Sequence, residues 1–403
     1  MIKAVLLDLD DTLITTHSDA FFPDYVGQLT KRLGAIAPEE TALSALRAGL
    51  RAAIANPNPL VTVREAFMVA FGDAIGGPHA DLDRAFEVFY AEDFPRMSSR
   101  IAPRARAIPL LDWLFEHDCL VVIATNPVTP ETAIHHRMTW GGIPIYHYPF
   151  ALVTTFETMH FAKPNPEYYE EILARIGTRP EEALMVGDHW DRDIVCAAAA
   201  GLNTFWITDG QQPEDNPMVK TDGQGSFETF VDLVLSGWLN TLTPLPRTHD
   251  SLLRRLAVTP SAIDALLRNH AKEAIERRPG KDEWSALETI SHLRDYELAE
   301  SRPWLERIRA EDNPFISATS SPQPHKHRPK APHEELKALA AIRAETVSWL
   351  RALPDSVWMR PARHSIFGPT RFEEMIGFMV EHDRTHLHQM RVALEKTSHS
   401  RAT

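Results

Sequence analysis

The sequence predicts an α/β protein with a Rossmann-like parallel sheet and an all-helical cap, followed by an all-α four-helix bundle. Three observations predict it. Strand and helix patterns alternate over residues 1–240, a proline-punctuated stretch interrupts them at 241–250, and long amphipathic patterns fill 251–403. Since 403 residues are enough for more than one hydrophobic core, we expect two domains joined by a linker.

Four short apolar runs predict the strands of the sheet. Near-continuous Val, Ile and Leu between polar residues is typical of parallel strands that are buried on both faces. Each run ends in polar residues, and ligands gather at the carboxyl ends of such strands. The runs are 2–10 (IKAVLLDLD), 119–126 (CLVVIATN), 181–188 (EEALMVGD) and 203–210 (NTFWITDG).

Residues from about 15 to 100 show amphipathic helical patterns and no strand-like run. An all-helical insert after the first strand predicts a cap beside the carboxyl edge of the sheet. Within it, Arg47, Arg51 and Arg64 could contact an anionic substrate tail, although solvated helix faces are their simpler interpretation. The four helical patterns cover 25–36, 38–55, 62–75 and 82–94.

The second half predicts helices only. Four long amphipathic segments in about 150 residues are typical of a four-helix bundle. The segment 317–333 carries Pro, Ser and charge without periodicity, so we expect a mobile loop there. The helical segments are 261–278, 284–308, 334–353 and 370–396.

Composition excludes several classes of protein. The chain has 42 basic and 55 acidic side chains, and a net acidic chain is a poor candidate for binding nucleic acid. Cys119 and Cys196 are its two cysteines, too few for a disulfide framework, so we expect a cytoplasmic location. We expect no signal peptide, because acidic residues follow the first seven, and no apolar run is long enough to span a membrane.

Asp8 and Asp10 follow the first predicted strand directly. Residues two apart in a strand point the same way, so both carboxylates can converge on one ligand. Paired carboxylates can hold a divalent cation or divide the work of nucleophile and acid. A solvated acidic turn is the alternative interpretation.

Further polar residues at strand ends give a pattern that resembles the haloacid dehalogenase superfamily over about residues 1–235. That family carries DxDx(T/V), then Ser or Thr, then Lys, then GDxxxxD, in this order along the chain. Four signals in the right order and context are specific as a set. Here the pattern is Asp8, Asp10 and Thr12, then Thr125, then Lys163, then Asp188 and Asp193.

The resemblance implies a phosphatase. Asp8 would attack phosphorus and form an aspartyl-phosphate, and Asp10 would protonate the leaving oxygen and later deprotonate water. Thr125 and Lys163 would bind the phosphoryl oxygens. Mg²⁺ would screen the repulsion between the two anions. Its ligands would be Asp8, the backbone carbonyl of Asp10 and Asp188, with Asp193 in support.

The family also contains dehalogenases and phosphonatases. Dehalogenases need neither a metal nor an acid two residues after the nucleophile, so Asp10 and Asp188 favour a phosphatase. Phosphonatases use a cap lysine, and Lys31 is the one lysine of the cap segment, which leaves that option open. The helical insert resembles the caps of phosphoglycolate-type and sugar-phosphate phosphatases, so we expect a small phosphorylated substrate.

Three histidines of the second half stand out. His382 and His386 are four apart, so a helix puts both imidazoles on one face, a spacing that suits two ligands of one metal. His292 lies on an apolar stripe with Leu287 and Ile290, where a core histidine is the alternative interpretation. His388 should face elsewhere on the helix.

These histidines, with Trp284-Ser285 before the second helix, resemble the DinB-like four-helix bundles over about residues 250–395. The resemblance implies that His292, His382 and His386 bind a divalent metal such as Zn²⁺ or Ni²⁺ with open coordination positions. Some relatives are thiol-dependent S-transferases, and such bundles often dimerise. Two hypotheses remain open: a phosphatase fused to a metal-binding bundle, and a regulatory first half with the activity, possibly S-transfer, in the bundle.

Overall fold

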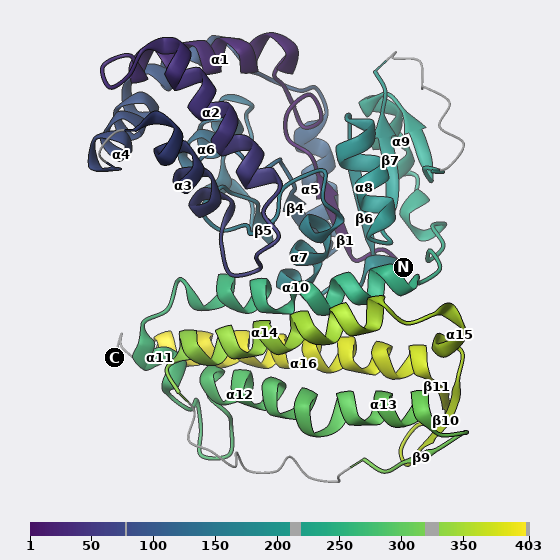
Figure 1. The fold of residues 1–403 in the computed structure, drawn as a ribbon. Helices are drawn as coiled ribbons and strands as arrows, with labels where there is room; N and C mark the ends of the chain where they lie inside the picture. The colour runs from purple at the N-terminus through teal and green to yellow at the C-terminus, as the bar shows by residue number, and fades with distance from the viewer. Residues whose placement is uncertain (77–78, 210–218, 319–329, 400–403) are drawn as a thin grey trace. The chain divides into compact units, whose positions relative to one another are not determined.

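The computed structural model describes residues 1–76, 79–209, 219–318 and 330–399. The chain divides into two compact units, Met1–Pro246 and Arg247–Thr403. In Figure 1 the first unit runs from purple to teal and the second from green to yellow. Within the described ranges, no helix is long and apolar enough to cross a membrane.

A six-stranded sheet forms the centre of the first unit, in the order β5-β4-β1-β6-β7-β8 with all neighbours parallel. The residues of β1 are fully buried, as its continuous apolar run predicts. All four predicted runs form strands, whereas β5 and β8 are too short to give a sequence signal. The strands are β1 (Ala4–Leu7), β4 (Leu120–Ile123), β5 (Leu152–Val153), β6 (Ala183–Gly187), β7 (Asn203–Ile207) and β8 (Gly223–Gly225).

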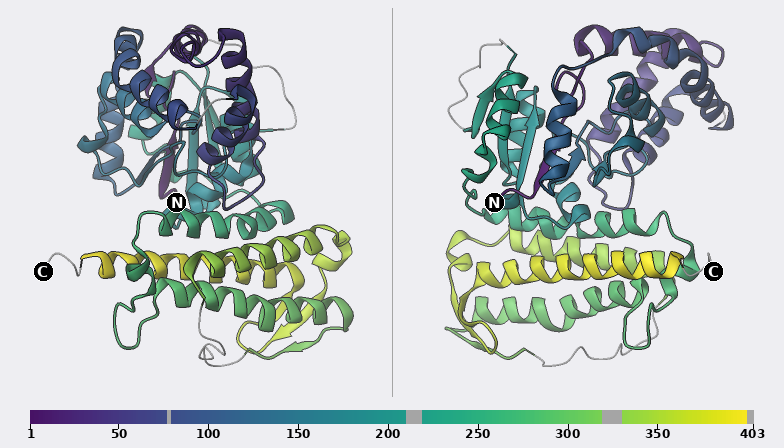
Figure 2. Two further views of the ribbon diagram at one scale, coloured as in Figure 1. Left: turned by 60° about the vertical axis from the view of Figure 1, so that its left-hand side comes forward. Right: turned by 180° about the vertical axis from the view of Figure 1, so that it is seen from behind.

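Helices connect the parallel strands and pack beside them, as the views in Figure 2 show. Their apolar residues recur at helical spacing: α9, for example, buries Phe227, Phe230, Val231 and Val234. The sheet and these helices form the Rossmann-like part of the predicted fold. The helices are α5 (Ala107–Glu116), α6 (Glu131–Trp140), α7 (Pro166–Ile176), α8 (Cys196–Ala199) and α9 (Phe227–Leu235), with helical turns η3 (Ile145–His147), η4 (Pro180–Glu182), η5 (Trp190–Val195) and η6 (Trp238–Asn240).

The all-helical cap is inserted between β1 and α5, as predicted. A short antiparallel ribbon of β2 (Ile14–Thr15) and β3 (Ala102–Pro103) carries the chain into and out of it. Thr62 and Glu65 form a capping box that starts α3. The cap consists of α1 (Ser18–Leu33), α2 (Glu39–Ile54), α3 (Val63–Ile75), α4 (His79–Val88), the π-helical turn η1 (Phe89–Asp93) and the 3-10 helix η2 (Phe94–Arg100).

The second unit is a bundle of four long helical segments, α10, α12 with its continuation α13, α14 and α16, which lie side by side in Figures 1 and 2. Ser285 and Glu288 form a capping box at the start of α12. The helices are α10 (His249–Leu267), α11 (Lys272–Glu276), α12 (Ala286–Tyr296), η7 (Glu297–Ser301), α13 (Arg302–Ala310), α14 (Pro332–Arg351), α15 (Asp355–Trp358) and α16 (Phe372–His399).

The expectation that the second half holds helices only is wrong. A small sheet of order β11-β10-β9 lies at the end of α13 and the start of α16, built from β9 (Phe315–Ile316), β10 (Pro361–His364) and β11 (Gly368–Arg371). Strands this short give no detectable periodicity, and Gly368 at φ 74° turns one into the next. The predicted segment 284–308 is interrupted by the π-helical turn η7.

Predicted boundaries shift in the second unit. The segment 261–278 is not one helix, because α10 ends at Leu267 and α11 begins only at Lys272. Helix α10 begins inside the proposed linker 241–250, because the Thr248 hydroxyl accepts a hydrogen bond from the Ser251 backbone N–H and caps it. Helix α14 begins at Pro332, within the expected loop 317–333. Residues 319–329 of that loop lie outside the described residues.

A proline within α10 is compensated from another helix. Pro260 has no N–H, so the carbonyl of Leu256, four residues earlier, loses its helical donor. The buried Arg343 of α14 donates from Nη1 to this carbonyl at 3.0 Å. Its guanidinium also bonds Glu297 Oε2 at 2.8 Å and Asp383 Oδ2 at 2.5 Å, so one cation joins α14 to α10, η7 and α16.

Candidate functional site

Carboxylates meet at the carboxyl edge of the sheet because β4, β1 and β6 are neighbours. Asp8 follows β1, Asp188 follows β6, and Asp193 lies in the helical turn η5 just beyond. One carboxylate oxygen from each of the three lies within 4.8 Å of the others. The structure therefore brings together three residues that are far apart in sequence.

Lys163 is fully enclosed beside these carboxylates, with 1% of its surface exposed. Its Nζ donates to Asp8 Oδ1 at 2.9 Å and to Asp193 Oδ1 at 2.5 Å. Burial alone would lower the pKa of this ammonium, but the charges of Asp193 and Asp8 outweigh it and raise the pKa. Lys163 is thus a permanent cation within the cluster.

One cation does not balance the acidic charge. Burial, opposed by Lys163 and reinforced by Asp193, raises the pKa of Asp8 to about 7. Burial and the charges of Asp8 and Asp193 raise the pKa of Asp188 to about 8. A second cation would relieve this repulsion, and carboxylate oxygens are the ligands that Mg²⁺ prefers. The donor set therefore fits a magnesium ion.

Local backbone features hold the acids in place. A Cβ on Gly187 would lie 2.3 Å from Asp193 Oδ2, so only glycine lets this carboxylate pack against the end of β6. The same oxygen accepts from the backbone N–H of His189 at 3.0 Å. The carbonyl of Asp188 accepts from Trp206 Nε1 at 2.8 Å. These contacts explain why Gly187 and Asp188 stand together at the end of β6.

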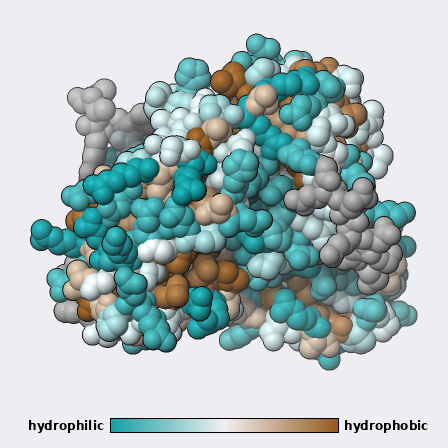
Figure 3. All heavy atoms as spheres, turned by 90° about the horizontal axis from the view of Figure 1, so that it is seen from above, coloured by the Kyte–Doolittle hydropathy of each residue, from teal (hydrophilic) through white to brown (hydrophobic). Residues whose placement is uncertain are grey.

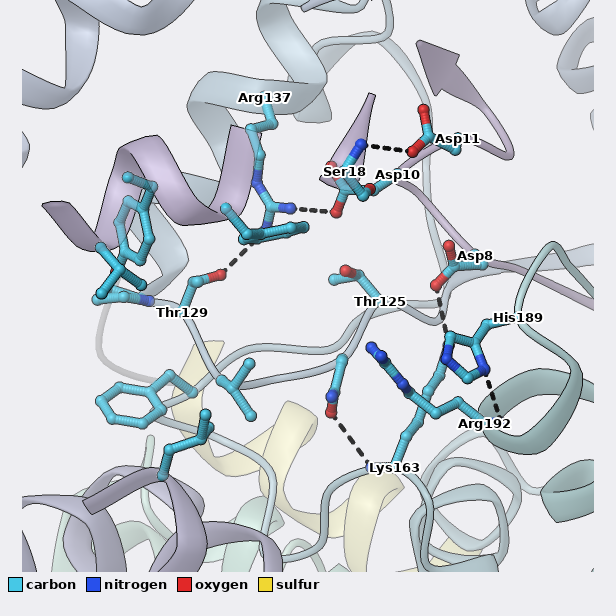
Figure 4. Close-up of a pocket in the computed structure, with 18 of the residues that line it drawn as sticks. Asp8, Asp10, Asp11, Ser18, Thr125, Thr129, Arg137, Lys163, His189 and Arg192 are labelled. Carbon is cyan, nitrogen blue, oxygen red and sulfur yellow. Dashed lines mark hydrogen bonds and ion pairs between the residues drawn. The ribbon is translucent and has the colours of Figure 1, made fainter. Parts of the chain in front are cut away.

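Thr125 is buried at the end of β4, and the Tyr168 hydroxyl donates to its carbonyl at 2.8 Å. Figure 4 shows Asp8, Thr125, Lys163 and Arg192 around one common space. The predicted phosphoryl-binding residues thus lie beside the predicted nucleophile. Arg192, from η5, adds a cation that the sequence reasoning did not assign.

Asp10 has two partners that were not predicted. The Thr16 hydroxyl donates to Asp10 Oδ1 at 2.8 Å, and Arg137 Nη1 bonds Asp10 Oδ2 (Figure 4). Arg137 is 1% exposed and also donates from Nη2 to the Thr129 hydroxyl at 3.0 Å. A sequence signal existed, since Arg137 lies four residues after Ala133 on the inward stripe of α6.

Asp11 connects the site to the cap. At φ 58° it turns the chain, and its side chain accepts from the backbone N–H groups of Thr16, His17 and Ser18 at 2.8–2.9 Å. Burial opposes ionisation, but these donors lower the pKa of Asp11 overall. An ionised Asp11 therefore fixes the entry of the chain into α1.

A cavity of about 2300 Å³ opens between the carboxylate cluster and the cap. Arg64 is the one of the three proposed cap arginines that lines it, and its Nη2 pairs with Asp83 Oδ1 at 3.1 Å. Arg47, Arg51 and Lys31 are exposed and do not line the cavity. Their solvated interpretation agrees with this geometry.

The three predicted histidines meet in the bundle. His292 comes from α12, and His382 and His386 come from successive turns of α16. His382 Nε2 lies 3.2 Å from His292 Nε2 and 3.2 Å from His386 Nε2. Nε2 atoms that converge in this way can bind one metal ion. His388 is exposed, as predicted.

The protonation of this cluster also suits a metal. Burial and the neighbouring His386 lower the pKa of His382 to about 4, and burial lowers the pKa of His386. His386 Nδ1 lies 2.8 Å from Gln389 Oε1, an acceptor that holds the proton on Nδ1. Its Nε2 lone pair is then free to coordinate. Neutral imidazoles of this kind fit a divalent ion such as Zn²⁺ or Ni²⁺.

Comparisons with known proteins give a family match for each half of the chain. Residues 2–201 match the haloacid dehalogenase-like hydrolase family, and residues 255–390 match the DinB superfamily. Phosphoserine phosphatase of Thermus thermophilus is 31% identical over 241 residues, which cover 53% of this chain and 91% of that protein. Glyceraldehyde 3-phosphate phosphatase of Methanopyrus kandleri is 28% identical over 232 residues, covering 54% and 88%.

Solved structures similar to this chain include a HAD phosphatase from Thermococcus onnurineus, with 20% identity and a TM-score of 0.39, covering 58% of this chain and 98% of that one. YfiT from Bacillus subtilis, described as a probable metal-dependent hydrolase with an unusual four-helix bundle topology, has 16% identity and a TM-score of 0.33, covering 38% and 93%.

The chain belongs to the haloacid dehalogenase-like hydrolase family and carries a DinB superfamily region in its second half. It is an enzyme, and its curated relatives place it with the phosphoric monoester hydrolases of that family. Both predicted resemblances are confirmed.

Proposed function

We propose that the first unit is a magnesium-dependent phosphatase that acts on a small phosphorylated metabolite through an aspartyl-phosphate on Asp8. The observation that carries this proposal is the contact of Lys163 Nζ with both Asp8 and Asp193, beside Asp188. This contact supports the proposal because Asp8, the residue proposed as nucleophile, lies beside a cation and beside the acids proposed as metal ligands, at one edge of the cavity.

In the first step, an Asp8 oxygen attacks phosphorus, and the bond from phosphorus to the leaving oxygen breaks. Lys163 occupies Asp8 Oδ1, which leaves Oδ2 for the attack. Thr125 and Lys163 bind the phosphoryl oxygens, and Asp10 gives a proton to the leaving oxygen. Mg²⁺ bound by Asp8, the carbonyl of Asp10 and Asp188, with Asp193 in support, supplies the charge that screens the two anions.

In the second step, water attacks the aspartyl-phosphate and Asp10 takes its proton. The bond from phosphorus to the Asp8 oxygen breaks, which releases phosphate and restores the carboxylate. Thr16 and Arg137 hold the Asp10 carboxylate between these steps, so both are positioning residues.

The assay is hydrolysis of p-nitrophenyl phosphate with and without Mg²⁺. We expect turnover that needs the metal and a loss of about 10⁴-fold or more in kcat for Asp8→Asn, because the nucleophile is removed. The matched control is Asp222→Asn, which lies outside the cavity. Activity that survives Asp8→Asn would show that Asp8 is not the nucleophile. A first natural panel contains O-phosphoserine and glyceraldehyde 3-phosphate, the substrates in the names of the two relatives.

For the second unit we propose a divalent metal site formed by His292, His382 and His386, with Zn²⁺ or Ni²⁺ as the ion. The convergence of the three Nε2 atoms supports it. Metal content by mass spectrometry should fall to background in the double variant His382→Ala/His386→Ala and persist in His388→Ala. Equal metal content in the wild type and in both variants would show that these histidines do not form a metal site.

Two earlier hypotheses stay predictions. If the first unit is only a regulatory module, the Mg²⁺ assay gives no turnover, and a thiol-transfer assay of the metal-loaded chain becomes the test of the bundle. Homodimerisation through the bundle is tested by sedimentation of the full chain. A cytoplasmic location and the lack of nucleic-acid binding likewise remain expectations from composition.

A further inference from the structure

The cavity has two chemically different ends. The carboxylate cluster, Lys163 and Arg192 lie at the edge of the sheet (Figure 4), and the cap helices line the opposite side. Because the phosphoryl group would be held by Lys163, the organic part of the substrate faces the cap. The side chains of the cap therefore decide which esters fit.

All four cap helices contribute apolar side chains to this wall. They include Phe22 of α1, Leu50 and Ile54 of α2, Met68 of α3 and Phe86 of α4. Leu50 is 39% exposed, although it lines an internal cavity. By contrast, the face of the molecule in Figure 3 is mainly hydrophilic, with hydrophobic residues in small separate groups. An apolar ligand would remove this exposed apolar surface from water, which favours binding.

The charges of this wall are acidic or already paired. Arg64 is the one Arg or Lys among the described cap residues that line the cavity, and Asp83 pairs with it at 3.1 Å. Asp19 and Glu87 also line the cap side. A carboxylate on the organic part of a substrate would meet acidic groups there, with Arg64 as its nearest cap cation already committed to Asp83.

We propose that the cap selects phosphoric monoesters whose organic part is uncharged and apolar, such as an aryl or branched alkyl group. It rejects esters that carry a second anionic group, because Asp19 and Glu87 line the cap side. A sugar, whose hydroxyls would lie against the apolar side chains of the wall, gains less there than an aryl group does. This inference rests on the proposed phosphatase function and gives that function a substrate class.

The test compares kcat/KM for benzyl phosphate and 4-carboxybenzyl phosphate, which differ in one distant carboxylate and little in leaving group. We expect benzyl phosphate to be preferred by about tenfold or more. Equal values, or preference for the carboxylate, would overturn the proposal. Glucose 6-phosphate is the third arm and should be poorer than benzyl phosphate; a sugar phosphate that is the best substrate also overturns it.

A variant pair localises the effect to the cap wall. Leu50→Arg puts a cation on the wall and should shift the ratio of the two kcat/KM values towards 4-carboxybenzyl phosphate by about tenfold. Ser44→Arg adds the same charge to an exposed position of α2 outside the cavity and should leave the ratio unchanged. Equal ratios in the two variants would contradict the assignment of this wall.

The two assays distinguish a wrong function from a wrong substrate class. If p-nitrophenyl phosphate is not hydrolysed with Mg²⁺, the proposed function itself is wrong. If it is hydrolysed while the benzyl pair shows no discrimination, the phosphatase stands and the substrate class falls.

Discussion

The carboxylate cluster of the first unit and the histidine cluster of the second both suit a cation, but their pKa values are shifted in opposite directions. In the first, crowded acids have raised pKa values, and in the second, a buried imidazole has a lowered one. Both shifts describe a site that gains from a cation: the acids lack positive charge, and the histidines are neutral and offer lone pairs. The first cluster also contains a cation, Lys163, which contacts Asp8 and Asp193.

The clusters also differ in construction. Two neighbouring strand ends and the helical turn η5 supply the acids, so sheet topology brings them together. Two successive turns of one helix supply two of the three histidines, so local helix geometry brings these two together. In the bundle the buried cation Arg343 pairs with Glu297 and Asp383, not with a histidine of the cluster. The comparison predicts that removing a cation affects activity in one unit and stability in the other.

The largest effect is expected for Lys163→Met. Loss of the cation that touches Asp8 and Asp193 removes a phosphoryl ligand and leaves the acids unbalanced, so kcat/KM for p-nitrophenyl phosphate should fall by about 10³-fold. Lys220→Met, at an exposed position, is the control. A change below tenfold would mean that Lys163 has only a structural role.

The corresponding change in the bundle is Arg343→Met. Two buried acids and the Leu256 carbonyl lose their partner, so the free energy of unfolding should fall by about 3–5 kcal/mol. Chemical denaturation of the full chain, followed by a bundle tryptophan, measures it. Arg351→Met, exposed on the same helix, should stay within about 0.5 kcal/mol of the wild type. Equal stabilities would refute the role of the network.

A smaller effect is expected for Arg137→Met, which frees the Asp10 carboxylate. The value of kcat for benzyl phosphate should fall by about 10²-fold with little change in KM, and less for p-nitrophenyl phosphate, whose leaving group needs no proton. Arg137→Lys should restore part of the activity. An equal loss for both esters would indicate general damage to the site instead of lost positioning.

The smallest effect is expected for a change of pH, which should affect metal binding at the carboxylate cluster more than at the histidine cluster. Protons compete with metal at Asp8 and Asp188, whose pKa values are about 7 and about 8, so the Mg²⁺ concentration for half-maximal activity should rise by about fiftyfold as the pH falls from 7 to 6. Burial lowers the pKa of His382 to about 4 and also lowers the pKa of His386, so metal retention by the bundle should change less over this range than the Mg²⁺ requirement does. If the Mg²⁺ requirement and metal retention by the bundle showed the same pH dependence, the proposed contrast between the two clusters would be wrong.

Much of this protein follows from local sequence. Four apolar runs that end in polar residues were enough to predict the sheet and its reactive edge, because a buried parallel strand needs continuous apolar residues. The spacing of His382 and His386 was enough to predict that both imidazoles lie on one face of a helix. Strands β9 to β11 escaped prediction because they are short and, unlike β1 and β4, do not lie in a continuous apolar run.

Contacts between distant segments were decided only by the tertiary structure. Arg137 finds Asp10 across 127 positions of the chain, and Arg343 replaces the donor that Pro260 lacks in another helix. Such pairings depend on which elements become neighbours, and the sequence fixes the type of each element far more directly than its neighbours. The residue types of both clusters are therefore evident in the chain, whereas their burial, their charge balance and the apolar wall of the cavity exist only once it is folded.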